Sequence, residues 1–454
     1  MKNLTLANIA AVTGGRYTGE AAKANIEVTA IETDSRKVPQ GGMFVAIKGE
    51  RVDGHKFIGQ VIEGGALAVL SEVDLGVQSF PYVLVESTLQ AVKDIAEFYL
   101  KELNIPVVGI AGSVGKTSTK EMTYSVLRQG FNALKTEGNF NNELGLPITI
   151  FRLRDEQLAV LEMGISDFGE MHRLAKVARP HTVIMTNIGY CHLENLIDRD
   201  GILKAKSEIF DFLEEDAHII LNGDDDKLAT VTEVRGIKPV TFGLDEKNDF
   251  WASNLKSLGL KGTACHIHTP VGECDVIVGM PGKHMVYNAL AGAAAGVAYG
   301  LTLEQIKAGI ESNGSLSGRF NIIDAERYTI IDDCYNANPV SMKASLEVLQ
   351  DGANRRVAIL GDMGELGANE RELHAGVGKF VATLNIDAIY CAGRLCEALA
   401  QAAIDGGFKG EVKHFVTREA LMDALPALVM DGDTILVKAS HFMQFSAIVS
   451  MLQK

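Results

Sequence analysis

The feature that most restricts the fold of this chain is an alternation of continuous apolar runs with helical segments. The run IPVVGIAG, residues 105–112, is apolar almost throughout, as expected of a strand buried on both faces of a parallel sheet. Similar runs follow at Leu158–Met163, His181–Ile188 and Ala217–Asn222, with helical segments between them. This alternation predicts an α/β fold with a mostly parallel sheet and crossover helices.

The chain has 454 residues, which is too many for a single hydrophobic core. Residues 1–86 show short strands, turns and small helices, and a helix from a Ser87 N-cap to Leu103 follows them. The stretch Ser312–Phe320 is rich in Gly and Ser and is typical of a linker, and α/β alternation resumes after it. We therefore predict three domains, over residues 1–86, 87–314 and 315–454.

Composition excludes several classes of protein. The net charge of −15 disfavours nucleic-acid binding, because phosphate backbones select basic faces. Six scattered cysteines without a C-x-x-C pair indicate reduced thiols rather than disulfides or a zinc site. The N-terminus is a poor signal peptide, and the most apolar stretch, Ala289–Gly300, falls short of the roughly 18 residues that span a bilayer. We predict a cytoplasmic protein that neither enters membranes nor binds nucleic acid.

The segment GSVGKTS, residues 112–118, lies between an apolar strand and a helix and is suited to phosphate binding. A Gly-rich turn in this position offers free backbone N–H groups and the positive end of a helix. A Walker A loop would have its first glycine at position 110, where this chain has Ile110. We expect Lys116 to reach the β- and γ-phosphates of a nucleotide and the Thr117 hydroxyl to bind Mg²⁺. The alternative is a Gly-rich turn with an incidental Lys-Thr pair.

Three further residues follow strands or lie on helices near this loop in the sequence. Glu162 ends a predicted strand, where ligands collect in open α/β sheets, and its carboxylate could bind Mg²⁺. His192 comes just after another strand, and Lys206 lies on a helix. Taken singly, Glu162 is better explained as a solvated carboxylate at the end of a strand, His192 as a structural histidine and Lys206 as a surface lysine.

Together with the loop, these motifs resemble the ATP-dependent Mur ligases of peptidoglycan synthesis, whose phosphate loop has the short form G-x-x-G-K-[ST]. The resemblance is strongest to the branch of that family that adds D-alanyl-D-alanine, and it extends through nearly the whole chain. It rests on the blocks TDSRKVPQGGMFVAIKGERVDGHKFI, GSVGKTSTKE, EGNFNNELGLP, NIGYCHLEN, KAKSEIF, GKHMVYNALAGAAAG, GRF, DDCYNANPVSM, LGDMGELG and VKAS.

The resemblance implies an N-terminal domain that binds a UDP-sugar, a central P-loop ATPase domain and a mobile, Rossmann-like C-terminal domain. It also implies a reaction in two steps. The terminal carboxylate of UDP-N-acetylmuramoyl-tripeptide attacks the γ-phosphate of ATP, and the amine of D-alanyl-D-alanine then attacks the acyl phosphate. Such a protein mainly aligns anions and neutralises charge. We expect these two small-molecule substrates as partners and a monomeric protein.

The resemblance also assigns nucleotide-binding roles. Asn288 should contact the adenine or ribose, and Asp333 should contact the ribose from the third domain. Arg319, in GRF, should reach the γ-phosphate as the domains close. The expected phosphate-loop residues are Gly112, Ser113, Val114, Gly115, Lys116, Thr117 and Ser118.

Two Mg²⁺ ions are implied at the same centre. Thr117 and Glu162 should hold the first ion, and Glu162, His192 and Lys206 the second. In relatives the lysine that matches Lys206 is carbamylated, which converts an ammonium into an anionic oxygen ligand. Carbamylation requires a neutral amine, so Lys206 should be desolvated or close to cations.

Substrate-binding roles follow from other blocks. Ser35, Arg36 and the Asp53-Gly54-His55 segment match the uridine-diphosphate side, although turn chemistry also explains the last of these. Asn139 and Asn142 should line the groove for the sugar-peptide, and Asn-rich loops are also good turns. Residues expected beside the reacting centre are Tyr335 and Asn336, and residues expected at the carboxylate of the amine substrate are Lys438 and Ser440.

The chain departs from the family pattern in three places. VKASHFMQF replaces the usual V-K-G-S-R, with Ala439 and His441 in place of Gly and Arg, which puts the role of His441 in doubt. Cys334 stands where Ser is usual, a near-isosteric change that should not alter the reaction. Val114 replaces a small polar residue, and we expect its backbone N–H to stay available to phosphate.

Three other functions compete with this interpretation. A sister ligase for the third peptide residue usually carries D-N-P-R, which is absent, and a folylpolyglutamate-synthetase-like enzyme is a further alternative. A nucleotide-dependent switch or scaffold without ligase activity is the alternative from another class. A GTPase-type switch should show N-K-x-D, which is also absent, and the charged residues that ligation needs are all retained.

Overall fold

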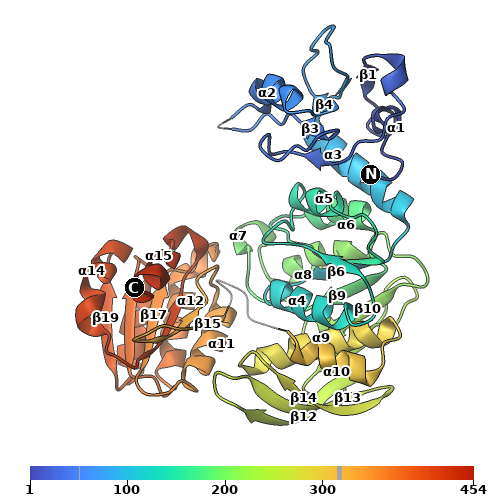
Figure 1. Ribbon diagram of the computed structural model, residues 1–454. Helices are drawn as coiled ribbons and strands as arrows, with labels where there is room; N and C mark the ends of the chain where they lie inside the picture. The colour runs from blue at the N-terminus through green and yellow to red at the C-terminus, as the bar shows by residue number, and fades with distance from the viewer. Residues whose placement is uncertain (51, 314–319) are drawn as a thin grey trace.

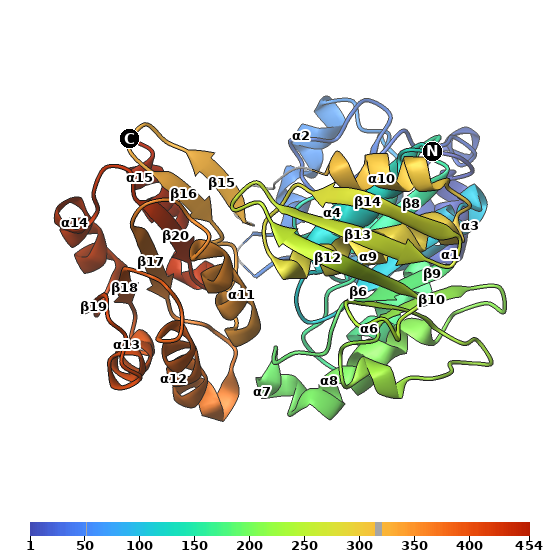
Figure 2. The same ribbon diagram turned by 90° about the horizontal axis from the view of Figure 1, so that it is seen from below.

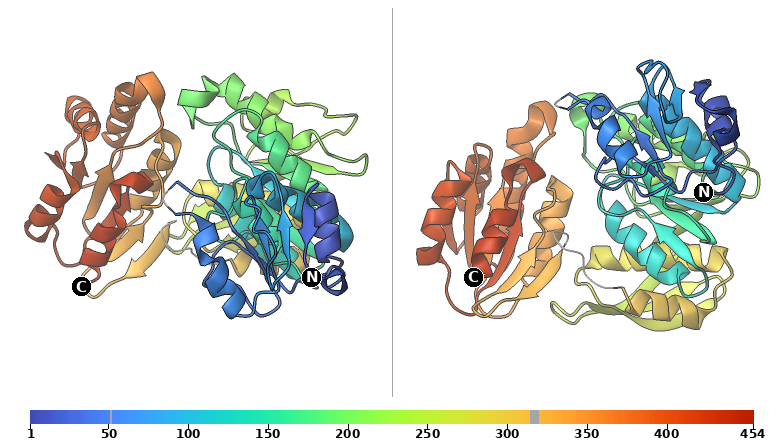
Figure 3. Two further views of the ribbon diagram at one scale, coloured as in Figure 1. Left: turned by 90° about the horizontal axis from the view of Figure 1, so that it is seen from above. Right: turned by 45° about the horizontal axis from the view of Figure 1, so that its top comes forward.

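The computed structural model describes residues 1–50, 52–313 and 320–454. Over these ranges the chain forms separate sheets that follow one another along the sequence (Figure 1). In both views of Figure 3 the C-terminal part, orange to red, lies beside the other two. The predicted α/β class with mostly parallel sheets is confirmed. Our second domain boundary, after residue 314, and Arg319 lie outside the described residues, and the first boundary stays a prediction.

The N-terminal sheet has the order β1-β5-β4-β3-β2, and all its pairs are parallel except β1 with β5. Helix α2 covers one face, against Phe44, Val69 and Tyr82, and α1 and α3 cover the other. Helix α3 begins after the Ser87 cap, whose Oγ accepts from the Gln90 N–H as predicted. The elements are β1 Arg16–Thr18, β2 Ile31–Glu32, β3 Met43–Val45, β4 Ala68–Ser71, β5 Tyr82–Leu84, α1 Leu6–Val12, α2 Ile58–Glu63 and α3 Thr88–Leu103.

The central sheet has the order β14-β13-β12-β11-β10-β9-β6-β8-β7 and is parallel from β7 to β12. The continuous apolar runs form its interior strands, because helices cover both faces. The strands are β6 Val107–Ala111, β7 Ala133–Lys135, β8 Leu158–Glu162, β9 Thr182–Met185, β10 His218–Asn222, β11 Val240–Gly243, β12 Phe250–Ser257, β13 Thr263–Thr269 and β14 Gly272–Val278.

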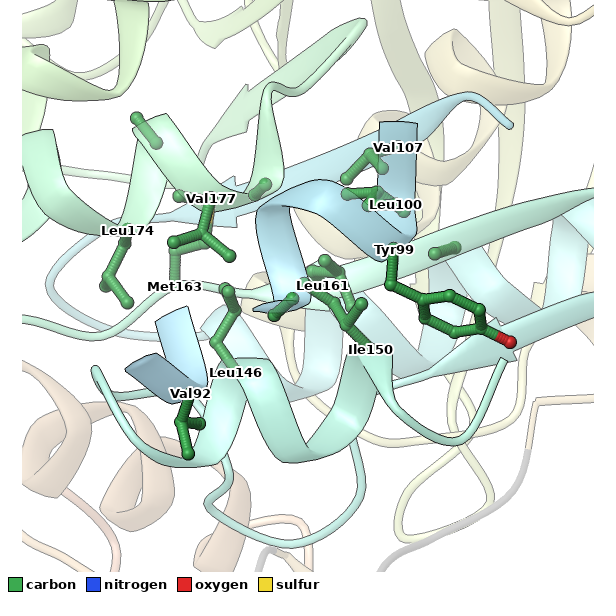
Figure 4. Close-up of a cluster of buried hydrophobic side chains, with 14 of the residues drawn as sticks. Val92, Tyr99, Leu100, Val107, Leu146, Ile150, Leu161, Met163, Leu174 and Val177 are labelled. Atoms are coloured by element: carbon green, nitrogen blue, oxygen red, sulfur yellow. The ribbon is translucent and has the colours of Figure 1, made fainter. Parts of the chain in front are cut away.

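Alternate side chains of β6 enter different cores. Val107 and Ala111 pack with α3, α5, α6 and α8, in a cluster that continues into the N-terminal sheet. Figure 4 shows Val107 among side chains of α3, α5 and α6. Val108 and Ile110 face α4, α9 and α10 instead. Ile110, where a Walker A glycine would stand, is thus a fully buried core residue. The helices are α4 Lys116–Leu127, α5 Gly145–Ile150, α6 Glu170–Ala178, α7 Leu193–Leu196, α8 Arg199–Ser207, α9 Lys283–Ala298 and α10 Leu303–Glu311.

The antiparallel extension formed by β12, β13 and β14 has no counterpart in our predictions. It lies over α9 and α10 as an outer layer of the molecule (Figure 2). Cys265, Ile267 and Val276 are buried towards these helices, whereas the residues between them are partly or fully exposed. These strands therefore alternate in polarity, unlike the continuous apolar runs that marked the parallel strands.

The C-terminal sheet has the order β15-β16-β20-β17-β18-β19, and its strands are parallel except for β15. Helices α11, α12 and α13 cover one face, and α14 and α15 cover the other. The elements are β15 Asn321–Asp324, β16 Thr329–Asp332, β17 Arg356–Gly361, β18 Ala388–Ala392, β19 Glu411–Phe415, β20 Thr434–Lys438, α11 Pro339–Leu349, α12 Glu370–Val381, α13 Cys396–Asp405, α14 Arg418–Leu428 and α15 Ser446–Leu452.

Two properties of the fold bring most of the predicted site residues together. Strands β6, β8 and β9 run parallel, so the loops after them meet at one edge of the central sheet. That edge faces the loop after β16 in the C-terminal sheet, since residues of both line one cavity. No helix in the described ranges is long and apolar enough to cross a membrane.

Candidate active site

A cavity of about 580 Å³ lies between the central and C-terminal sheets. The loops after β6, β8 and β9 and the start of α9 form one wall, and the loop after β16 and the start of α11 form the other. The cavity thus collects motifs that lie far apart in the sequence. Predicted site residues that line it are Ser113, Val114, Gly115, Lys116, Ser118, Asn139, Asn142, Glu162, His192, Asn288, Asp333, Tyr335, Asn336 and Lys438.

The other predicted residues in the described ranges are not among those that line this cavity. Thr117 and Lys206 are buried beside it, and each exposes only a few per cent of its surface. Ser440 is buried in the C-terminal domain, and Ser35 and Arg36 lie in the N-terminal domain.

Two glycines fix the shape of the short phosphate loop. Gly112 has φ +146°, and a Cβ there would come within 1.9 Å of Thr186 Oγ1. Gly115 has φ +82° and forms the N-cap of α4, so it also requires a backbone conformation that side chains disfavour. Lys116 Nζ donates to the carbonyl oxygens of Gly112 at 2.9 Å and Ser113 at 3.4 Å. The loop therefore curls around the ammonium group of its own lysine.

Our expectation that the Val114 N–H is available to phosphate is wrong. This N–H donates to Asn187 Oδ1 at 3.0 Å, and Asn187 Nδ2 donates to the Val114 carbonyl at 2.9 Å. Thr186 Oγ1 donates to the same carbonyl at 2.7 Å. The tip of the loop is held by the segment after β9, which no pattern in the sequence connected with it.

The Thr117 hydroxyl and the Glu162 carboxylate meet at the edge of the sheet. Thr117 Oγ1 donates to Glu162 Oε2 at 2.8 Å, and Asn141 Nδ2 donates to Glu162 Oε1 at 2.8 Å. Mg²⁺ with oxygen ligands at 2.0–2.1 Å in an octahedron places neighbouring ligands about 2.9 Å apart. The Thr117 and Glu162 oxygens have this spacing, so they fit one edge of a Mg²⁺ site.

Lys120 belongs to this centre although it was absent from our predictions. It is 1% exposed, its Nζ lies 3.9 Å from Glu162 Oε2, and it donates to the Thr136 carbonyl at 2.7 Å. Thr136 Oγ1 in turn accepts from the Glu162 N–H at 3.0 Å. Lys120 follows the loop by one helical turn, which is the signal that could have identified it. Its Nζ also lies 3.1 Å from Glu121 Oε1, so its positive charge is shared between Glu121 and the buried Glu162 carboxylate.

His192 and Lys206 lie close enough to the loop to interact electrostatically. Burial lowers the pKa of His192, and the positive charges of Lys206 and Lys116 lower it further, while Glu365 opposes them. His192 Nδ1 lies 2.8 Å from Glu365 Oε2, which links the central and C-terminal domains. Burial also lowers the pKa of Lys206 to about 8, so this amine meets the requirement of desolvation. A protonated Lys206 cannot bind a metal, so a second ion at this position would require a modified or neutral form of this side chain.

Asn288 and Asp333 face the cavity from opposite walls. Asn288 Oδ1 accepts from Thr119 Oγ1 at 2.8 Å, which ties α9 to α4. Asp333 Oδ2 accepts from Lys438 Nζ at 2.5 Å and from Ser345 Oγ at 2.6 Å. Lys438 is therefore already paired with a carboxylate in this structure. His284, another lining residue that our predictions did not include, faces this pair, and desolvation lowers its pKa to about 4.

Models of Mur ligase domains match most of the chain. The Mur ligase family catalytic domain matches residues 27–118, the Mur ligase middle domain 110–296, and the Mur ligase glutamate ligase domain 318–441. UDP-N-acetylmuramoyl-tripeptide--D-alanyl-D-alanine ligase of Escherichia coli is 36% identical over 100% of this chain and 99% of its own. The chain belongs to the Mur ligase family.

Solved Mur ligase structures have the same architecture. MurF from Acinetobacter baumannii superposes with a TM-score of 0.90 at 32% identity, covering 99% of this chain and 98% of its own. MurF ligase from Thermotoga maritima, solved in complex with ADP, superposes with a TM-score of 0.82 at 29% identity, covering 93% and 97%. The three-domain architecture that the resemblance implied is thus confirmed.

The structure shows the contacts of residues at or beside the positions that depart from the Mur ligase pattern. The Cys334 thiol donates to Asp332 Oδ1 at 2.8 Å, as a Ser hydroxyl could. The exposed ring of His441 lies 5.7 Å from that of Tyr335, centroid to centroid. The Ser440 hydroxyl accepts from the Gly364 N–H at 2.9 Å and donates to the Ala337 carbonyl at 3.2 Å. Its direct contacts are therefore with loop backbone.

Other predicted substrate-binding residues of this Mur ligase make hydrogen bonds and ion pairs with residues close to them in the sequence. Asn142 Oδ1 accepts from the Gly145 N–H at 2.8 Å, the turn chemistry that was the alternative to a binding role. Asp53 Oδ1 likewise accepts from the His55 N–H at 3.0 Å and lies 2.7 Å from His55 Nδ1. The exposed Arg36 pairs with Asp34 at 2.8 Å. These contacts leave a binding role for each residue as a prediction.

Proposed function

We propose that this Mur ligase joins D-alanyl-D-alanine to UDP-N-acetylmuramoyl-tripeptide at the expense of ATP. The observation that carries the proposal is the cavity between two domains. It combines a phosphate loop on one wall with Asp333, Tyr335 and Lys438 on the other. Full-length similarity to ligases named for this reaction supports the choice of substrates.

The phosphate loop supports ATP as the nucleotide. Gly112 and Gly115 allow the tight turn of the loop, Lys116 supplies a cation, and α4 directs its positive end at the same point. The related ligase from Thermotoga maritima was solved with ADP. We propose that Ser118, Asn288 and Asp333 complete the nucleotide site, and that Arg319 approaches the γ-phosphate.

We propose Mg²⁺ bound by Thr117 and Glu162, and a second ion held by Glu162, His192 and a carbamylated Lys206. When bound, the ions would neutralise phosphate charge and polarise the phosphoryl and carboxylate oxygens. Asn141 orients Glu162 through its other oxygen, and Lys120 balances its charge. Incorporation of ¹³C-labelled bicarbonate at Lys206, detected by NMR, tests the modification. An active enzyme without this carbamate signal would overturn it.

The residues of the chain would act mainly by alignment. Lys116 would hold the phosphates while the peptide carboxylate approaches from the Asn139 side of the cavity. The wall around Asp333 and Lys438 would receive the amine substrate, with Tyr335 and Asn336 beside it. Burial in a cavity between two domains would exclude water from the acyl phosphate, which protects it from hydrolysis.

We also propose that the three domains, over residues 1–86, 87–314 and 315–454, have separate roles. The first would bind the uridine-diphosphate end of the substrate through Ser35 and Arg36. Its core is continuous with that of the central sheet through α3, so it would present the substrate from a fixed position. We propose that the protein acts as a monomer in the cytoplasm.

The decisive experiment measures phosphate release from ATP with UDP-N-acetylmuramoyl-tripeptide, with and without D-alanyl-D-alanine. We expect release to require both substrates and to match the amount of pentapeptide formed. Phosphate release at the same rate with and without the dipeptide would contradict the substrate assignment.

A matched pair of lysine variants tests the loop. Lys116→Ala should abolish turnover, because it removes the cation within the loop. Lys101→Ala removes an exposed lysine that pairs with Glu97 on α3, and it should leave turnover unchanged. Full activity of Lys116→Ala would rule out the loop as the nucleotide site.

A further inference from the structure

The antiparallel extension carries a group of imidazole and carboxylate side chains that the proposed ligase reaction does not use. His266 and His268 lie two residues apart on β13 and therefore share one face of the sheet. Their partners across the ladder on β14 are Asp275 and Glu273. The opposite face packs against α9 and α10, so this group lies on the outer surface (Figure 2).

Three of these side chains, His266, His268 and Glu273, bring potential ligand atoms close together. His268 Nδ1 lies 3.0 Å from Glu273 Oε2, and His266 Nε2 lies 3.4 Å from the same oxygen. One ligand atom from each of the three residues lies within 4.8 Å of the other two. Tetrahedral zinc, with ligands at 2.0–2.2 Å, places its ligand atoms about 3.3–3.6 Å apart. Small side-chain adjustments would bring all three onto one ion.

Both imidazoles are oriented by hydrogen bonds on their other nitrogen. His266 Nδ1 lies 2.7 Å from Asp275 Oδ1, and His268 Nε2 lies 2.9 Å from Ser253 Oγ on β12. If these nitrogens carry the protons, the lone pairs of His266 Nε2 and His268 Nδ1 both point towards Glu273. Metal-binding histidines are held in this way by carboxylates and hydroxyls around a site.

A tryptophan stacks on the second imidazole. The Trp251 ring lies 3.7 Å from the His268 ring, centroid to centroid, at 7° between planes. This contact fixes the plane of the His268 ring, and Trp251 is the single tryptophan of the chain. Its fluorescence therefore reports on the surroundings of this group of residues.

We propose that His266, His268 and Glu273 form a surface site for a zinc-class divalent cation, with water in the fourth position. Two nitrogen ligands and one carboxylate suit Zn²⁺ and also Cu²⁺, but not the oxygen-selective Mg²⁺. The ion would crosslink β13 and β14 and so stabilise the extension that covers α9 and α10. The alternative is a pair of protonated histidines held by carboxylates, which would repel a cation.

The test uses the full-length, metal-free protein with excess Mg²⁺ present. Zn²⁺ titrated by calorimetry should bind at this site and raise the unfolding temperature. Cu²⁺ should quench Trp251, since the paramagnetic ion would bind the imidazole that stacks against this ring. Absence of Trp251 quenching, or quenching without saturation, would overturn the proposal.

Variants separate the site from other metal-binding groups. His266→Gln, His268→Gln and Glu273→Gln should each weaken binding by at least about tenfold, and Asp275→Asn should weaken it by about the same factor through orientation alone. Cys274→Ser, on the buried side of β14, and His172→Gln, on α6, are the controls and should bind normally.

Circular dichroism and ATP turnover check that each variant folds, because none of these residues lines the cavity. Normal binding by folded His268→Gln and Glu273→Gln would overturn the proposal. Loss of binding in Cys274→Ser would assign the metal to a thiol and would equally overturn it.

Discussion

Thr117 Oγ1 donates a hydrogen bond to Glu162 Oε2 at 2.8 Å, and this bond joins the first turn of α4 to the end of β8. The two residues are far apart in the sequence, and the parallel pairing of β6 with β8 brings them together. The spacing of these oxygens matches neighbouring ligands of Mg²⁺. We therefore expect both side chains to be needed for the proposed Mg²⁺-dependent step.

Thr117→Val should reduce turnover roughly a hundredfold, because it removes one oxygen while preserving the shape of the side chain. Steady-state phosphate release at varied Mg²⁺ measures the effect, and the Mg²⁺ needed for half-maximal rate should rise. Thr123→Val is the matched control, six residues along the same helix, and should keep full activity. Equal losses in the two variants would mean that α4 merely tolerates valine poorly.

Thr123→Val should also stabilise the protein. Thr123 Oγ1 is buried and has no hydrogen-bond partner in the described part of the chain. Replacing a buried, unpaired hydroxyl by a methyl group should raise the free energy of unfolding by about 1–3 kcal/mol. Urea denaturation of the two proteins measures the difference. A destabilised variant would indicate that a water molecule or another group pairs with this hydroxyl.

Asn187→Ala should weaken nucleotide binding without abolishing it. Asn187 holds both the N–H and the carbonyl of Val114, so its loss frees the tip of the phosphate loop. Two lost hydrogen bonds at about 1 kcal/mol each predict a KM for ATP that is roughly tenfold or more higher. Asn132→Ala, at an exposed turn before β7, is the control. An unchanged KM would show that the contacts of Thr186 and Ser113 are enough to fix the loop.

Lys438→Met should destabilise the C-terminal domain, because it leaves Asp333 without its closest cation. Lys438 is almost fully buried, and removal of one partner of a buried ion pair costs about 3–5 kcal/mol. Adding Asp333→Asn should recover part of that loss, since the uncompensated charge is gone. A double-mutant cycle followed by urea denaturation measures the coupling. Strictly additive effects would contradict a stabilising pair.

His374 should make folding sensitive to mild acid. Its Nε2 accepts from the Met363 N–H at 2.9 Å, its Nδ1 lies 2.7 Å from the Glu370 carbonyl, and burial lowers its pKa. The unfolded chain binds a proton near the ordinary pKa of 6.5 while the folded chain resists it, so stability falls as the pH drops below that value. Unfolding free energies at neutral and acidic pH measure this loss. His374→Gln should show a smaller dependence on pH, and an unchanged slope would assign the effect to other groups.

Much of the fold could be predicted because its strands are buried on both faces. The runs at β6, β8, β9 and β10 are recognisable as strands for that reason, and the Ser87 cap marked the start of α3. The extension of β12 to β14 was not predicted because one face of it is exposed to solvent. Polar and apolar side chains therefore alternate along its strands, without the continuous apolar runs of the buried strands. The motif blocks identified many of the predicted site residues that line the cavity, but not Asn141 or His284, which also line it, nor Lys120, which lies beside Glu162.

The sequence by itself determined the short loop, its two glycines and the charged residues around it, because each is a property of local chain chemistry. Only the tertiary structure decided how these groups are paired. Val114 is held by Asn187, and Lys438 is held by Asp333, because strands distant in sequence end at the same edges of their sheets. The alternation of β13 put His266 and His268 on one face, and pairing with β14 placed Glu273 between them. Such contacts depend on sheet register, which no local pattern in the chain specifies.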